Sequence, residues 1–348
     1  MKILIRATNW VGDAIMALPA LRAVRSRFSH ATIAIVARPY VADIYRNQGI
    51  CDELIGYDVK GRHTGVRGRE RLAQKLRAQN FDVALLLQNA FDAAWLAWRA
   101  GIPERIGYAR DARSLLLTKK IPAPKRGEIP PHEQFYYLEL IRRVGWINSL
   151  PNETLVTLTV SDQQRSNAEQ ILLSAGSRQN MPRIAIGAGA SYGSAKCWPP
   201  DRFSDFVNRF RLHTDADVIL FGTEAEQKVF DDIAAGIRGP STSLVGKTSI
   251  ADLPALLSRC QLFVGNDSGA MHVAAAVDLP VVAIFGPTDP YGTAPITPRC
   301  TVMQDKPYCS PCFLRRCPID HRCMTAVKSE AVEAAARAWL SSVEVASG

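Results

Sequence analysis

The stretch from Gly265 to His272 limits most strongly what this chain can fold into. It follows the apolar run Leu262–Val264, which predicts a buried strand, and it precedes an alanine-rich run that predicts a packed helix. A polar, glycine-containing turn between a parallel strand and a helix offers backbone N–H groups and the positive end of the helix dipole to an anion. Ser268 and Gly269 are small enough to let a pyrophosphate approach, although Asp267 or Ser268 can equally serve as a simple helix cap.

The same alternation of strand, polar turn and helix occurs twice along the chain. It opens with a strand at 2–6, a polar loop at 8–13, a helix at 14–28 and a strand at 32–37, and it resumes with a strand at 183–187. This pattern predicts doubly wound parallel sheets, which bind ligands beyond the carboxyl ends of their strands. We therefore predict an α/β protein with two Rossmann-like domains facing across a cleft.

We expect residues 1–160 to form an N-terminal domain and residues 161–325 a C-terminal domain. Residues 326–348 are expected to form a helix that packs back towards the N-terminal domain. Short strands are predicted around Leu115–Leu117 and at Leu155–Leu158, and Ser161 or Asp162 is expected to cap the next helix.

Composition narrows the class of protein. The 348 residues are 47% apolar and 22% charged, which is typical of a soluble globular chain long enough for two domains. No apolar run reaches the length of about 18 residues that a membrane-spanning helix needs. Because the chain starts directly on a strand, we expect no signal peptide and a cytoplasmic location. The formal net charge of +9 favours acidic partners.

Three polar loops follow predicted strands of the second domain, at 187–191, at 222–226 and at 265–272, and we expect them to converge on one ligand. Lys196, beyond the first loop, can give a point charge to a diphosphate, or it can be an ordinary exposed lysine. Glu226 can accept hydrogen bonds from ribose hydroxyls, or it can be a favourable charge in the first turn of a helix.

Several common nucleotide-binding patterns are absent from the sequence. Gly187-Ala188-Gly189 begins a dinucleotide fingerprint, but Tyr192 stands where its third glycine is required. The chain contains no Walker lysine motif. Asp215-Ala216-Asp217 resembles a metal-binding DxD pattern, but we reject it because it precedes a strand and so lies at the amino end of the sheet.

Four separated motifs carry a family resemblance: Asn9–Asp13, Lys196–Pro199, Asn266–His272 and Phe285–Thr288. In this order, from Met1 to about Thr288, they resemble the ADP-heptose:lipopolysaccharide heptosyltransferases. The first motif is most similar to the type II enzymes, since type I enzymes more usually have a serine-methionine pair before the Gly-Asp. The resemblance implies a GT-B fold in which residues 1–160 are the acceptor-binding domain and residues 161–325 the nucleotide-sugar-binding domain. It also implies ADP-heptose as donor, a lipid A-linked inner-core acceptor, and inverting transfer that requires no metal cofactor.

Inverting transfer needs a base for the acceptor hydroxyl and stabilisation of the leaving ADP. We expect Asp13 to be the base, although it directly precedes a helix and can simply cap it, and Lys196 to support the leaving diphosphate. The resemblance places acceptor binding at Asn9, Trp10, Gly12 and Arg62. It places donor binding at Gly187, Ser191, Lys196, Glu226, Asp267, Ser268, Gly269, Met271 and His272.

The segment from Lys60 to Arg77 is strongly basic, with Glu70 as its single acidic residue, and its glycines predict a flexible first half. It is either a solvated loop and helix face or a clamp for a phosphorylated or membrane-anchored acceptor. We expect the protein to associate peripherally with the anionic inner face of the inner membrane. No nucleic-acid motif is recognised, so a nucleic-acid partner is not expected.

Cys309, Cys312, Cys317 and Cys323 form a cluster whose spacing suggests a structural zinc or other thiophilic metal, the alternative being four reduced thiols. Three other functions remain open from the residues. They are transfer of another sugar or to another acceptor, as in type I or III enzymes; GT-B nucleotide-sugar epimerisation; and non-enzymatic nucleotide or nucleic-acid binding.

Overall fold

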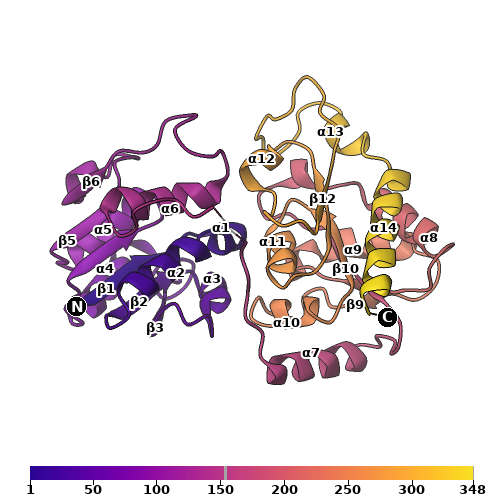
Figure 1. Ribbon diagram of the computed structural model, residues 1–348, viewed down its shortest axis with the longest axis horizontal. Coiled ribbons are helices and arrows are strands. Elements are labelled where there is room, and N and C mark those ends of the chain that lie inside the picture. Colours follow the sequence, from indigo (N-terminus) through magenta and orange to yellow (C-terminus); the bar gives the residue numbers. More distant parts are fainter. Residues whose placement is uncertain (153–154, 348) are drawn as a thin grey trace. The chain divides into compact units, whose positions relative to one another are not determined.

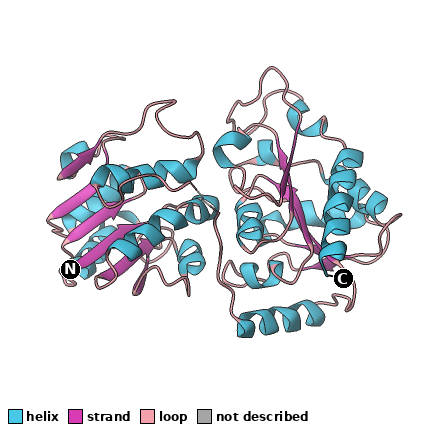
Figure 2. Ribbon diagram, viewed as in Figure 1, coloured by secondary structure: helices cyan, strands magenta, loops and turns pink. Residues whose placement is uncertain are grey.

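The computed structural model describes residues 1–152 and 155–347, and the chain separates into two compact units. The first unit is Met1–Val156 and the second is Thr157–Gly348, so the division falls after Val156 where we predicted one after residue 160. In each unit, a parallel sheet lies between helices (Figure 2).

The first unit has the strand order β3-β2-β1-β4-β5-β6, with all neighbours parallel. The strands are β1 Lys2–Arg6, β2 Thr32–Ala37, β3 Glu53–Gly56, β4 Val83–Leu86, β5 Glu104–Tyr108 and β6 Lys119–Ile121. The helices are α1 Val11–Met16, α2 Leu18–Arg27, α3 Pro39–Tyr45, α4 Gly65–Arg77, α5 Phe91–Arg99, the 3₁₀ helix η1 Ser114–Leu116, and α6 Glu133–Val144. The order reverses between β1 and β4, and this switch point is where doubly wound sheets bind ligands.

The second unit repeats the winding, with the order β12-β11-β10-β7-β8-β9. Its strands are β7 Arg183–Gly187, β8 Asp217–Leu220, β9 Thr242–Ser243, β10 Leu262–Asn266, β11 Val281–Phe285 and β12 Cys300–Gln304. Its helices are α7 Asp162–Ser174, η2 Ser194–Lys196, α8 Pro200–Phe210, η3 Glu224–Glu226, α9 Gln227–Gly236, α10 Leu253–Leu257, α11 Gly269–Ala276, α12 Pro290–Thr293, α13 Arg322–Thr325 and α14 Ser329–Ser347. The switch point lies between β7 and β10, so Gly187 and Asn266 end on adjacent strands.

The C-terminal helix α14 packs on the second unit. Val332, Ala336 and Leu340, four residues apart on one face, are buried in the core of the second unit. The helix packs against α8 and beside β10, β11 and β12 (Figure 1). Its apolar face is therefore occupied within its own unit.

Three local predictions differ from the structure, and a fourth is confirmed. The helix predicted at 14–28 is divided into α1 and α2, with Pro19 in the first turn of α2. Leu115 and Leu116 lie in η1 rather than in a strand. Residues 155–158 form no strand, and the backbone N–H of Leu158 instead bonds Ala276 O at the end of α11. The predicted Ser161 cap is confirmed, because its side chain accepts from the backbone of Gln164 and the Gln164 side chain reciprocates.

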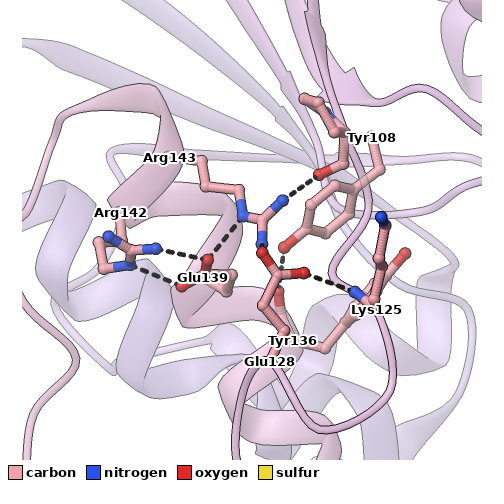
Figure 3. A network of polar contacts seen from close by, with 8 residues as sticks. Tyr108, Lys125, Glu128, Tyr136, Glu139, Arg142 and Arg143 are labelled. Atoms are coloured by element: carbon pink, nitrogen blue, oxygen red, sulfur yellow. Dashed lines mark hydrogen bonds and ion pairs between the residues drawn. The ribbon is translucent and has the colours of Figure 1, made fainter.

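A polar network fixes α6 within the first unit (Figure 3). The fully buried Glu139 carboxylate accepts hydrogen bonds from Arg142 and Arg143, and Arg143 also pairs with Glu128 at 2.6 Å. Burial opposes ionisation of Glu139, but the two guanidinium groups hold its pKa below the ordinary value. Within the described residues, no helix is long and apolar enough to cross a membrane.

Candidate active site

One buried amide side chain joins three loops at the carboxyl edge of the second sheet. Asn266 ends β10 and is fully buried. Its Oδ1 accepts a hydrogen bond from the backbone N–H of Trp198 at 3.0 Å, and its Nδ2 donates to Ala188 O at 2.6 Å. The loop after β7, the segment after Lys196 and the turn before α11 are thereby held together, so two of the three loops that we expected to converge, 187–191 and 265–272, are joined here.

Lys196 and Asp267 form an ion pair within this edge. Lys196 Nζ lies 2.5 Å from Asp267 Oδ2, and the side chains are only 13% and 6% exposed. The Thr288 hydroxyl donates to the same carboxylate oxygen at 2.6 Å, and the Lys196 ammonium lies 5.0 Å from the centre of the Tyr192 ring. The Asp267 carboxylate and the Tyr192 ring therefore hold the Lys196 ammonium in a largely buried position beside the turn. Lys196 is not an ordinary exposed lysine.

The turn continues into α11 through Ser268, which occupies the N-cap position. Its Oγ is buried, and among the residues that the structure describes it has no hydrogen-bond partner. A buried hydroxyl without a partner is energetically unfavourable, and at a helix start it lies where an anion is attracted by the backbone amides and the dipole. Gly269 begins the helix, whereas Met271 and His272 are buried within it.

The glycine loop after β7 is shaped by close packing. A Cβ on Gly187 would lie 2.4 Å from the Phe263 ring, and one on Gly189 would lie 2.0 Å from Glu226 Oε1. Glu226 Oε2 accepts from both the backbone N–H and the hydroxyl of Thr223 at 2.8 Å, which makes it part of a capping box for η3. The helix-start role that we considered for Glu226 is thus present in the structure, while its other oxygen faces Gly189. Ser191 is exposed further along the same loop.

The DxD-like segment lies where we predicted. Asp217 begins β8 and accepts hydrogen bonds from Ser177 Oγ and from the backbone of Arg178. Asp215 pairs with the Arg178 side chain. Both carboxylates are at the amino end of the sheet, away from the edge where such sheets bind ligands, so the position that we predicted for them is confirmed.

The cysteine-containing segment holds the loops around Asp267. His321 Nε2 is 2.7 Å from Ala195 O, the backbone N–H of Ala195 donates to Arg315 O at 3.1 Å, and Ser310 Oγ donates to Gly286 O at 2.6 Å. These contacts connect the segment to the loops on both sides of Asp267. The spacing of the cysteines suggested a structural role for this segment, but not which loops the segment would hold together.

The four clustered cysteines do not form a metal centre in this structure. All are free thiols bordering one small cavity, but Cys323 is buried whereas Cys312 is exposed, so they lie at different depths. Burial, and then the neighbouring thiols, raise the pKa of Cys323 to about 11. Across residues 1–152 and 155–347, no group of three or more His, Cys, Asp or Glu side chains is placed to hold a metal ion. The structural metal that we considered is therefore not supported.

In the first unit, Asp13 lies in the first turn of α1, beyond the carboxyl end of β1. Burial raises the pKa values of Tyr45 and Tyr137, and the charge of Asp13 adds to both increases. Asp13 is therefore near both phenols at the switch point of the first sheet. Its position suits either a base or a favourable helix-start charge.

Asn9 and Trp10 lie in the loop between β1 and α1. Asn9 Oδ1 accepts from the buried Arg6 at 2.8 Å and from Arg38 at 3.4 Å, and its backbone carbonyl accepts from the Tyr40 hydroxyl. Burial, followed by repulsion from Arg38, lowers the pKa of Arg6 to about 10. Trp10 is 45% exposed and is followed by Val11 and Gly12. Asn9 thus fixes the loop, while the Trp10 ring remains available to a ligand.

The basic segment is more ordered than we predicted. Arg62 is exposed in the turn after β3, but α4 already begins at Gly65, so the glycine-rich half is not wholly a loop. A Cβ on Gly68 would lie 2.5 Å from the His63 carbonyl carbon, which explains a glycine inside the helix. Arg69 pairs with Asp92 at 3.2 Å, whereas Arg67 is exposed.

Sequence reasoning did not assign three residues that shape this edge. Asn266 and Thr288 lie within two of the motifs that carry the family resemblance, and those motifs were the available signal for their importance. Their roles, however, depend on partners far away in the sequence. Tyr192 was considered only as the residue that breaks a glycine fingerprint, and it proves to lie against the Lys196 ammonium.

Comparison with known proteins agrees with this geometry. A family model described as glycosyltransferase family 9 (heptosyltransferase) matches residues 69–322. Lipopolysaccharide heptosyltransferase 2 of Escherichia coli strain K12 is 29% identical over 313 residues, covering 87% of this chain and 88% of that protein. The solved structure of E. coli ADP-heptose lps heptosyltransferase II has a TM-score of 0.82 at 26% identity, covering 99% of this chain and all of that one. The structure of E. coli heptosyltransferase WaaC with ADP-2-deoxy-2-fluoro heptose has a TM-score of 0.66 at 20% identity, covering 96% and 98%. The predicted GT-B fold is confirmed, and the chain belongs to glycosyltransferase family 9, the heptosyltransferases.

Proposed function

We propose that this protein transfers a heptose from ADP-L-glycero-D-manno-heptose to the inner core of lipopolysaccharide, adding the second heptose to the first. Its E. coli relative is named lipopolysaccharide heptosyltransferase 2, and a similar solved structure is named an ADP-heptose heptosyltransferase. The observation that carries the proposal is the Lys196–Asp267 pair beside the unpartnered Ser268 Oγ at the start of α11.

The donor diphosphate is proposed to bind at this point. Lys196 supplies a positive charge, and the Ser268 hydroxyl and the first amides of α11 supply hydrogen-bond donors. Asp267 holds the ammonium rather than contacting the diphosphate, which it would repel. Gly187, Ser191, Glu226, Gly269, Met271 and His272 complete the proposed donor site, with the buried Met271 and His272 supporting the turn from within α11.

The proposed reaction is a single displacement with inversion at the anomeric carbon. Asp13 takes the proton of the acceptor hydroxyl as its oxygen attacks that carbon. The bond from the anomeric carbon to the diphosphate oxygen breaks, and ADP leaves with the bonding electron pair. Lys196 and the amides at the start of α11 stabilise the charge that develops on ADP, so the proposed mechanism assigns no step to a metal ion.

The acceptor is proposed to bind the first unit through Asn9, Trp10, Gly12 and Arg62. Trp10 offers an exposed aromatic face to a sugar ring, and Arg62 offers an exposed cation to an anionic group on the core saccharide. Because this acceptor is lipid A-linked, we place the reaction at the cytoplasmic face of the inner membrane, with the protein bound peripherally.

The test measures ADP release from ADP-heptose with and without a heptosylated lipopolysaccharide-core acceptor. We expect release to depend on the acceptor, to persist with chelator present, and to yield a product of inverted anomeric configuration. Equal ADP release without acceptor, or conversion of the sugar nucleotide alone, would instead favour an epimerase. Preference for a core lacking the first heptose would favour type I transfer, and preference for a core already carrying two heptoses would favour type III.

A further inference from the structure

The segment from Lys306 to Arg322, between β12 and α13 at one end of the second unit (Figure 1), exposes large apolar side chains. Tyr308 is 85% exposed, Phe313 55%, Leu314 44% and Ile319 55%. We name these four residues the apolar tip. Single exposed apolar residues are common on proteins, but a concentration in one short segment marks an interaction site.

Cationic side chains surround the apolar tip in sequence. Lys306, Arg315, Arg316 and Arg322, which we name the basic collar, are opposed within the segment by Asp320 alone, so its formal net charge is +3. Arg322 pairs with Asp320 at 2.8 Å. Among the described residues, the other three collar side chains have no ion-pair partner. The segment therefore combines apolar surface with unneutralised positive charge.

The backbone beneath the tip is held firmly. The N–H groups of Cys312 and Phe313 both donate to Pro287 O, at 3.0 and 2.8 Å, and Phe313 O accepts from the Tyr192 hydroxyl at 2.7 Å. The Phe313 backbone has φ of +55°, in the left-handed region that bulky residues avoid. The Phe313 ring remains half exposed in this unfavourable backbone conformation, so burial of the ring within the protein does not explain why the conformation is adopted.

We propose that the apolar tip and the basic collar form the contact of this protein with an anionic lipid surface. Tyr and Phe rings and short aliphatic side chains are suited to the headgroup boundary, and arginines beside them attract anionic lipid phosphates. The inference rests on the proposed function insofar as a lipid-linked acceptor brings the enzyme to a membrane. It goes further by naming the contacting residues.

The basic helix α4 is a weaker candidate for this contact. Its apolar residues Leu72, Ala73 and Leu76 are buried against the first unit, and Val66 is its one large exposed apolar side chain among those described. It can attract an anionic surface only by charge, which salt screens, whereas the tip adds burial of apolar area, which salt does not weaken. Val66 and Arg67 also provide a matched control, because they are an exposed apolar residue followed by an exposed arginine.

The experiment is flotation of the full chain with phosphatidylcholine vesicles, with and without phosphatidylglycerol, at low and high salt. The tip variant carries Phe313→Ser and Leu314→Ser, the collar variant carries Lys306→Gln and Arg316→Gln, and the control carries Val66→Ser and Arg67→Gln. We expect the native protein and the control to float with anionic vesicles. The tip variant should lose about tenfold or more of its partitioning at either salt concentration. The collar variant should lose about tenfold at low salt only.

Calorimetric ADP binding and the unfolding temperature, measured for every variant, separate this inference from the proposed function. The tip variant should keep both values, because its substitutions leave the backbone hydrogen bonds to Pro287 and Tyr192 in place. Flotation of the tip variant equal to that of the native protein would overturn the inference, as would native binding indifferent to phosphatidylglycerol. A native dimer that becomes a monomer in the tip variant would assign the apolar tip to a second copy of the chain and also overturn it. Failure of ADP binding in the native protein would count against the proposed function while leaving the flotation result to stand.

Discussion

Replacing Lys196 with methionine should weaken ADP binding, and replacing Asp267 with asparagine in the same protein should partly restore it. The prediction follows from the geometry of the pair. Lys196 Nζ is 2.5 Å from Asp267 Oδ2, and Thr288 Oγ1 donates to the same oxygen. Lys196→Met removes the cation and leaves a carboxylate, 6% exposed, with one hydroxyl donor beside the proposed diphosphate site.

The magnitude can be worked from these contacts. Loss of one charge-assisted hydrogen bond to a phosphate costs about 1.5–3 kcal/mol. Repulsion by the uncompensated carboxylate moves Lys196→Met to the upper end, a loss of about 150-fold in ADP affinity at low salt. Asp267→Asn in that background removes the negative charge and keeps an acceptor for Thr288, so we expect about 1–2 kcal/mol, or roughly 5- to 30-fold, to be regained. Asp267→Asn alone frees Lys196 but loosens its position, and these opposing effects should leave affinity within about tenfold of the native value.

The assay is calorimetric titration of ADP at low and high ionic strength for the two single variants and the double variant. Lys228→Met is the matched control, since that lysine is 89% exposed and pairs only loosely with Asp232 at 3.6 Å. Its affinity should stay within about twofold of native, as for most exposed ion pairs. A double variant that binds ADP as weakly as Lys196→Met, or more weakly, would refute the argument that the carboxylate acts chiefly by holding the ammonium.

Three further predictions concern the base, the edge and the pH dependence of stability. Asp13→Asn should reduce turnover about 100- to 10,000-fold with ADP affinity unchanged. The control variant Asp43→Asn, in α3, should keep near-normal turnover. Normal turnover in Asp13→Asn would show that Asp13 is only a favourable charge at the start of α1. Asn266→Ala leaves two buried backbone groups without partners, so urea unfolding should show a loss of about 2–4 kcal/mol, and a loss below about 0.5 would contradict this role. Hydrogen bonds from Arg183, opposed by burial, lower the pKa of Glu169 from 4.5 to about 2. The ionised Glu169 therefore stabilises the folded protein above pH 4.5, and this contribution is lost as the pH falls towards 2. With solvent screening we expect it to be about 1–2 kcal/mol, so Glu169→Gln should weaken the decrease in the free energy of unfolding between pH 4.5 and pH 2. An unchanged decrease in the variant would be a contrary result.

The central strands were predictable because parallel strands buried on both faces are continuous apolar runs. β1, β2 and β7 have the predicted bounds for this reason. The strands at the sheet margins were missed, because they do not carry such a run. β12 is only half buried along its length, and β9 is two residues long. An apolar run in the sequence indicates a buried strand, so such runs identify the central strands of each sheet better than the edge strands.

For the polar residues at the carboxyl edge of the second sheet, the sequence predicted their positions but not their contacts. The turn at Asp267 could be placed after a strand and before a helix from sequence alone. The partners of Asn266, however, are 68 and 78 residues away, and no pattern within a local window indicates them. Likewise, the spacing of the clustered cysteines permitted a metal site, but spacing does not report depth, and Cys312 is exposed while Cys323 is buried.

The hydrogen bonds that position Lys196 come largely from far along the chain. Tyr192 donates to Phe313 O, 121 residues away, and Ala195 O bonds His321, 126 residues away. A substitution in the segment from Lys306 to Arg322 that shifted its backbone would therefore move the Lys196 ammonium without touching the substrate. Catalytic groups in enzymes must be held to well within about 1 Å of their productive positions. We therefore expect such a change to lower turnover without altering the side chains of Asp13 and Lys196, to which the proposed mechanism assigns the chemistry. The Phe313 and Arg315 carbonyls and the His321 ring thus position the loop that carries Lys196. The Phe313 and Leu314 side chains, 55% and 44% exposed, remain free to serve a second surface.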